Sequence, residues 1–93
     1  MYQTNRELSL QNAVSVAQSG LSAISQGETE FDLSALVVVD SAAVAVMLDW
    51  QRAASLKNKT IHFKSIPSNL LSLIALYGMS ELLSTNPSQV ERH

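Results

Sequence analysis

The chain is poor in the residue types that usually carry chemistry. Among its 93 residues there is no cysteine, and only two histidines and three glycines. The lack of cysteine excludes disulfides, thiolate metal sites and a cysteine nucleophile. The two histidines, His62 and His93, match no metal-binding or triad spacing, and Gly20, Gly27 and Gly78 are too scattered for a phosphate-cradling loop. We therefore expect no enzyme activity, no metal and no cofactor.

Charge is also scarce. Charged residues make up 15% of the chain and the formal net charge is −2, which gives no electrostatic case for nucleic-acid binding. No apolar run reaches the ~20 residues that span a bilayer, and residues 1–7 lack the features of a signal peptide. We expect a cytoplasmic protein without direct membrane insertion. Because 46% of the chain is apolar, we also expect a partner, or a second copy in a homodimer of the isolated chain, to cover apolar surface.

The hydrophobic pattern predicts one α/β domain over residues 1–85 and a polar, flexible tail over 86–93. Alternation at 7–10 and 13–17, around a Gln-Asn pair, predicts a β-hairpin. A strand is predicted over 31–39. The crossover before it, 18–30, has only thirteen residues, close to the minimum of about a dozen. We therefore expect a shortened first crossover helix of one or two turns at 21–26.

The second half predicts a helix over 42–56, a strand over 60–65 and a last helix from 68 that Gly78 stops, with a further short element at 81–83. Right-handed crossovers then place the helices on one face of a small mixed sheet. The first two turns of helix 42–56 are apolar all round, more than one buried stripe requires. Trp50 shares a helix side with Ala43, Met47 and Ala54, which favours core packing; the alternative is an interface anchor.

The junction between strand 31–39 and helix 42–56 is the most informative feature. The apolar strand ends at an acid–hydroxyl pair, Asp40 and Ser41, which opens an Ala/Val-rich helix. A helix start exposes backbone N–H groups without intrahelical partners, and these residue types cap them. On local physics alone, a well-made turn and a functional site are equally good interpretations.

Two short motifs in this order resemble the STAS domain (sulphate transporter and anti-sigma factor antagonist). The first consists of Asp32, Leu33, Ser34, Leu36, Val39, Asp40, Ser41, Ala42 and Ala43, and the second is the stretch 73–79, Leu-Ile-Ala-Leu-Tyr-Gly-Met. The resemblance covers residues 8–83. It implies a STAS-like fold and a non-enzymatic role in protein–protein interaction.

Within that family, Asp40-Ser41-Ala42-Ala43 is more similar to the STAS subunit of the Mla intermembrane phospholipid ABC transporter. This implies a bacterial protein that binds the cytoplasmic ATPase subunit and, through it, the permease, at the periphery of the inner membrane, in the maintenance of lipid asymmetry. Small residues at the helix start would let the partner backbone come close. The partner-binding residues implied are Asp40, which holds the turn, and Ser41, Ala42, Val44, Ala45 and Leu48.

The alternative function is an anti-sigma factor antagonist that is switched by serine phosphorylation. In that branch the turn is usually Asp-Ser-Ser-Gly, and the second serine receives the phosphate. Ala42 stands at that position here, so Ser41 is the only phosphosite left in the turn. A third option, a module that binds a small ligand or lipid, has no polar pocket signature to support it.

Overall fold

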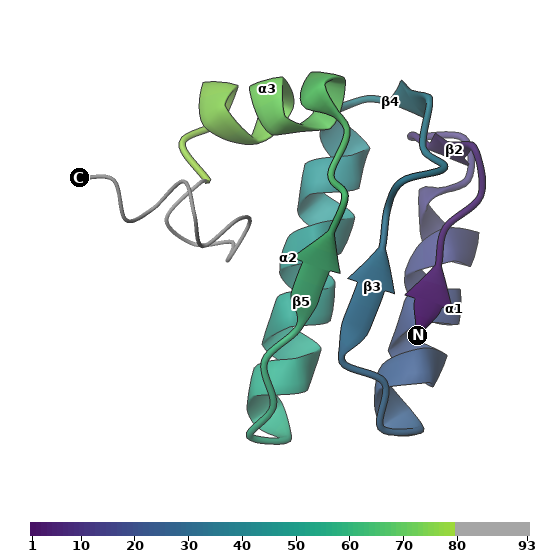
Figure 1. Ribbon diagram of the computed structural model, residues 1–93, viewed down its shortest axis with the longest axis vertical. Coiled ribbons are helices and arrows are strands. Elements are labelled where there is room, and N and C mark those ends of the chain that lie inside the picture. The colour runs from purple at the N-terminus through teal and green to yellow at the C-terminus, as the bar shows by residue number, and fades with distance from the viewer. Residues whose placement is uncertain (80–93) are drawn as a thin grey trace.

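The computed structural model describes residues 1–79, which form three helices and five short strands (Figure 1). In chain order the elements are β1 Tyr2–Gln3, β2 Glu7–Leu8, α1 Ala13–Ser25, β3 Glu30–Asp32, β4 Val38–Val39, α2 Ser41–Leu56, β5 His62–Lys64 and α3 Ser68–Leu76. The short element predicted at 81–83 and the predicted tail at 86–93 lie outside the described residues. The predicted α/β class is confirmed.

The strands form two small sheets. One has the order β1-β3-β5 and the other pairs β2 with β4. All three strand pairs are parallel, with Tyr2 opposite Phe31, Phe31 opposite Phe63, and Leu8 opposite Val39. The mixed sheet that we predicted is therefore wrong for residues 1–79, because its antiparallel part depended on the hairpin.

Helix α1 shows that two predictions, the hairpin and the shortened first crossover helix, are wrong. Residues 13–17, predicted as the second hairpin strand, begin a helix of 13 residues. Because β1 pairs in parallel with β3, and β2 with β4, the chain that connects the first two strands to the next two needs a crossover rather than a tight turn. The Ala, Ser and Val residues of 13–17 fit a helix as well as a strand. The helix is favoured because it buries Gly20 and Ile24.

The predicted strand 31–39 is interrupted. The Asp32 carboxylate accepts a hydrogen bond from the backbone N–H of Ser34 (2.9 Å), and Leu36 N–H donates to Leu33 O (3.1 Å). These bonds turn the chain, so that β3 pairs in one sheet and β4 in the other. The backbone bond from Ser34, together with side-chain bonds from Ser34 and Gln3, lowers the pKa of Asp32 from its usual value.

Helices α1 and α2 cover the same face of the three-stranded sheet, and α3 crosses one end of the molecule (Figure 1). Helices on one face of the sheet were predicted. The start of α3 is tied to the loop before β4 by a bond from Asn69 Nδ2 to Val37 O of 3.1 Å. Within residues 1–79, no helix combines the length and the apolar character that crossing a membrane requires.

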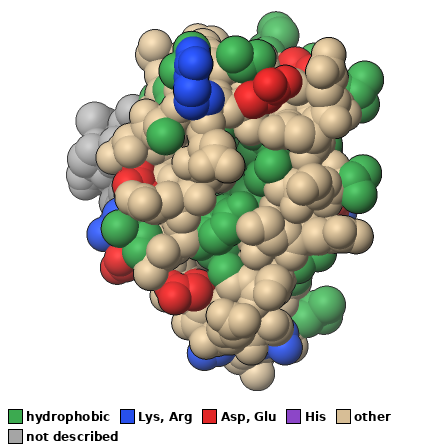
Figure 2. Space-filling view, turned by 90° about the vertical axis from the view of Figure 1, so that its right-hand side faces the viewer, with side chains coloured by type: hydrophobic (Ala, Val, Ile, Leu, Met, Phe, Trp, Pro, Cys, Tyr) green, Lys and Arg blue, Asp and Glu red, His purple; other side chains and the backbone are tan. Residues whose placement is uncertain are grey.

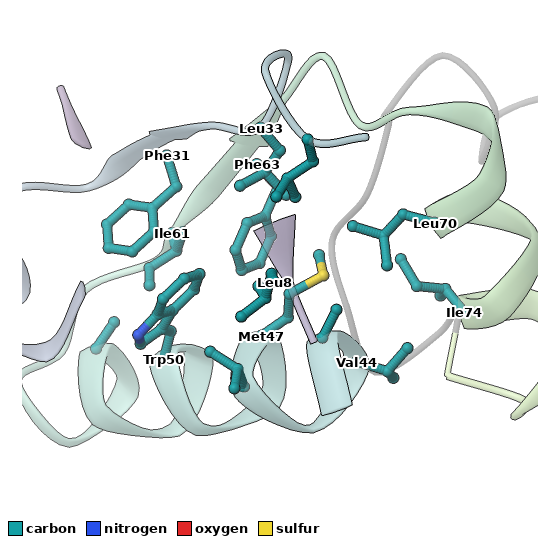
Figure 3. Close-up of a cluster of buried hydrophobic side chains, with 14 of the residues drawn as sticks. Leu8, Phe31, Leu33, Val44, Met47, Trp50, Ile61, Phe63, Leu70 and Ile74 are labelled. Carbon is teal, nitrogen blue, oxygen red and sulfur yellow. The ribbon is translucent and has the colours of Figure 1, made fainter. Parts of the chain in front are cut away.

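The core lies between the sheet and the two long helices, with Trp50 among Phe31, Ile61 and Met47 (Figure 3). Trp50 is completely buried, and its indole N–H donates to the Ala17 carbonyl at 3.0 Å. The core-packing prediction for Trp50 is confirmed, and the interface-anchor alternative is wrong. Gly20 permits this arrangement, because a Cβ there would overlap the indole ring.

The opposite face of the sheet is polar. His62 and Lys64 are exposed on β5, and Lys64 Nζ lies 3.4 Å from a carboxylate oxygen of Glu30. His62 is thus solvated on the outward face of its strand. The face without helices therefore exposes polar side chains.

Candidate partner-binding surface

Asp40 holds the turn at the start of α2. Its backbone is extended, and one carboxylate oxygen accepts the N–H of Ala42 at 2.9 Å, which is an N-cap. The other oxygen accepts the N–H of Leu10 at 3.0 Å. Both oxygens are therefore engaged with backbone, one on α2 and one on the turn after β2. Asp40 positions two segments, as expected for a residue that holds the turn.

The two sides of α2 differ in burial. The inner side places Ala43, Met47, Trp50 and Ala54 in the core, at 0–1% exposure. On the outer side Ser41 and Ala45 are exposed and Leu48 is half-buried. The sequence predicted this excess of apolar character in the first two turns of the helix, and the structure shows which positions of the helix carry it.

A shallow, open groove of about 260 Å³ runs along this outer side, between α2 and the end of α3. We call it the α2–α3 groove; its lining residues are Ser41, Val44, Ala45, Leu48, Tyr77 and Met79. Val44 is only 4% exposed, so it belongs to the core although it also lines the groove. Two other residues of the predicted site, Asp40 and Ala42, do not line the groove.

Tyr77 and Met79 were not predicted as site residues. Tyr77 and Leu76 belong to the apolar run that ends α3, yet they are 48% and 74% exposed, respectively. Helix α3 buries a narrower stripe, Leu70 and Ile74. The chain then turns at a left-handed Gly78 (φ 68°).

The turn at the end of α3 places its last residues beside α2. The N–H of Gly78 donates to Ala75 O at 3.0 Å, and the N–H of Met79 donates to Ile74 O at 2.9 Å. Left-handed glycine after a helix, followed by an apolar residue, is a known C-terminal stop. The glycine in the Tyr-Gly-Met sequence was the signal for this turn, but its position beside α2 depends on how α3 packs.

The residues that line the groove favour binding of a partner over catalysis. They include two hydroxyl groups, those of Ser41 and Tyr77, and no acidic, basic or histidine side chain. Among residues 1–79, no group of three or more His, Cys, Asp or Glu side chains could hold a metal ion. An open, apolar and uncharged hollow of this kind is typical of surfaces that another macromolecule covers.

Comparison with known protein families identifies the family of the chain. A family model described as "Mlab, STAS domain" matches residues 6–84. The chain therefore belongs to the STAS domain family, as its motifs indicated. A comparison with curated proteins finds no match. Membership supports a general STAS role in interaction or regulation, and STAS domains are generally non-enzymatic binding modules.

Proposed function

We propose that this protein is the non-enzymatic STAS subunit of an ABC transporter that moves phospholipids between membranes. It binds the cytoplasmic ATPase subunit and supports its assembly and activity, and so lies at the periphery of the inner membrane, reaching the permease through the ATPase. The observation that carries the proposal is the apolar α2–α3 groove, which opens directly beside the capped Asp40–Ser41 turn.

The lining indicates what the partner surface must be. Ser41 and Ala45 are small, so a partner backbone or helix can approach α2 closely. Leu48 and the ring of Tyr77 add apolar contact area beside them. Because residues 41–48 include no charge, the complementary surface is apolar, and its burial against the groove would drive association.

A site for a small ligand fits less well. Ligand pockets usually enclose about 300–1,000 Å³ and bring several polar groups together to orient the ligand. The α2–α3 groove is smaller, at about 260 Å³, and open. A protein partner supplies the missing wall, whereas a lipid headgroup would find only two hydroxyls to bind.

One observation favours the second candidate, an anti-sigma factor antagonist. Ser41 is exposed and is the first residue of α2. A kinase could reach it, and a phosphate at a helix N-terminus is favoured by the helix dipole. The same charge would stand on the rim of an apolar groove and prevent docking. Ala42, in place of the usual phosphorylated serine, makes this the weaker candidate.

Affinity purification of the chain from its native cells, with mass spectrometry of the recovered proteins, tests the proposal. The bait is the wild-type chain, and Ser41→Glu is the matched bait that should lose partners of the groove. We expect an ABC ATPase and its permease with the wild-type bait. Recovery of a serine kinase or a sigma-regulating protein instead would support the phosphorylation switch. Recovery of the chain alone, as a homodimer, would contradict both.

A further inference from the structure

A second apolar surface adjoins the α2–α3 groove, on the other side of Asp40. Leu10, in the turn after β2, is 80% exposed, and Val14, in the first turn of α1, is 72% exposed. We call these two residues the Leu10–Val14 corner. These two exposed branched side chains offer apolar area that a partner could cover.

The corner is held in place by hydrogen bonds. Asn12 braces the turn from inside, because its side-chain oxygen accepts the N–H of Ser9 (3.0 Å) and its amide donates to Glu7 O (2.9 Å). The N–H of Leu10 is bound by Asp40 at 3.0 Å. Leu10 is therefore presented on a fixed backbone. A segment whose backbone is already held by hydrogen bonds loses little further backbone freedom when a partner covers it.

The corner and the groove meet at one carboxylate. One oxygen of Asp40 binds Leu10 and the other binds the first turn of α2, whose first residue, Ser41, lines the groove. Asp40 thus fixes the corner and the groove relative to each other. The turn that carries Leu10 therefore lies beside the start of α2, although 30 residues of chain separate Leu10 from Asp40.

Charge is absent on both sides of this junction. No charged residue occurs in 8–27 or in 41–48. The side of the molecule with β1 and α1 has apolar side chains in a band through its middle and along one margin. Its charged side chains lie mainly along the top, the left side and the bottom (Figure 2). The charge between the two regions is Asp40, and both of its carboxylate oxygens already accept backbone N–H groups. An uncharged partner surface that covered both regions would therefore bury no carboxylate without hydrogen-bond partners.

Size also indicates that the groove is only part of the interface. A stable protein–protein contact buries roughly 800 Å² on each partner. A hollow of about 260 Å³ lined by six residues offers a small part of such an area. The adjoining apolar surface is the natural place for the rest.

We propose that the ATPase subunit covers the Leu10–Val14 corner together with the α2–α3 groove. In this proposal Leu10 is the main apolar contact outside the groove, and Asp40 positions the turn of Leu10 relative to α2. This inference rests on the proposed function, and it states how far the partner surface extends.

Titration of the purified ATPase subunit with four variants tests the inference. Leu10→Glu and Val14→Glu change the corner, and Ser41→Glu changes the groove. Leu56→Glu is the control, since Leu56 is 88% exposed at the last position of α2. Thermal unfolding of each variant checks that the fold is intact. We expect Ser41→Glu to weaken binding about thirtyfold or more and Leu10→Glu roughly tenfold or more. Val14→Glu should weaken it less, and Leu56→Glu should leave it unchanged.

The outcomes separate the two proposals. Weakening by Ser41→Glu alone would overturn the extended surface and leave the proposed function intact. Weakening by Leu10→Glu alone, or equal weakening by Leu56→Glu, would also overturn one continuous surface across Asp40. Unchanged binding in all four variants would contradict both the extension and the docking surface on which it rests.

Discussion

The inner and outer sides of α2 are built from similar residues but differ in what covers them. Met47 and Leu48 are neighbours of similar size; Met47 is fully buried, while Leu48 is half-buried and lines the α2–α3 groove. On the inner side the sheet and α1 cover the helix. On the outer side, within residues 1–79, the end of α3 and the turn after it line the groove together with α2.

This difference shows that apolar character alone does not assign a role to a residue of α2. Burial inside the domain stabilises the fold, and the same type of residue on the open side has area left for a partner. The position around the helix axis separates the two roles. The predictions below test whether the two sides can be perturbed separately.

The largest expected effect comes from Met47→Ala compared with Leu48→Ala. Met47→Ala leaves a cavity in the core and should lower the free energy of unfolding by about 2–5 kcal/mol. Leu48→Ala removes a half-buried side chain, and should cost about 1 kcal/mol or less. Urea unfolding measures both. Equal losses of stability would break the distinction between the two sides.

Gly20→Ala should be destabilising although alanine is the better helix former. The added methyl group overlaps the Trp50 indole, and overpacking of this kind costs about 1–3 kcal/mol. Ser19→Ala, at an exposed position of the same helix, is the matched control and should change stability by less than about 0.5 kcal/mol. A Gly20→Ala protein as stable as the wild type would contradict the close approach of α1 to α2.

Asp40 caps α2 and also holds the turn that carries Leu10, and two substitutions separate these two roles. Asp40→Ala removes the cap and should cost about 1 kcal/mol of stability. Asp40→Asn keeps one acceptor oxygen for the cap, but its NH₂ group cannot accept from Leu10. We expect Asp40→Asn to fold almost normally and to weaken partner binding through the displaced Leu10. Chemical denaturation and titration with the ATPase subunit measure the two effects; a loss of stability in Asp40→Asn equal to that in Asp40→Ala would contradict this separation.

The smallest expected effect is a pH dependence at Asp32, which lies on neither side of α2. Its pKa is lowered in the folded protein, chiefly by the Ser34 N–H. The unfolded chain therefore binds a proton first, so the contribution of Asp32 to stability is present above the usual carboxyl pKa and disappears as the pH falls through the folded value. The melting temperature of the wild type should exceed that of Asp32→Asn near neutrality, and the difference should shrink as the pH falls below the usual carboxyl pKa. A difference independent of pH would contradict this account.

Much of the fold followed from local patterns in the sequence. The alternation of Ile61 and Phe63 with His62, the capping residue Asp40 and the helix stop at Gly78 each have one physical meaning, and the structure confirms them. Residues 13–17 have no such single meaning, because a short run of Ala, Ser and Val fits a strand or a helix. Only the parallel pairing of β2 with β4, which is a long-range contact, decides between them.

The part of the candidate site that depends on local spacing was predictable, and the part that depends on long-range packing was not. Ser41, Val44, Ala45 and Leu48 lie within two turns of one helix, so their spacing places them together. Tyr77 and Met79 reach the groove through the orientation of α3, which no local pattern specifies. The exposure of Leu10 beside Asp40 likewise depends on a hydrogen bond across 30 residues.

The central claim is that the outer side of α2 binds a partner and contributes little to the fold. Ser41→Glu tests it most directly, by unfolding and by titration with the purified ATPase subunit. An acidic residue in the first turn of a helix is favourable, so stability should change by less than about 0.5 kcal/mol. Binding should weaken by more than about 2 kcal/mol, because the charge would be buried unpaired. Unchanged binding by a folded Ser41→Glu protein would contradict the claim.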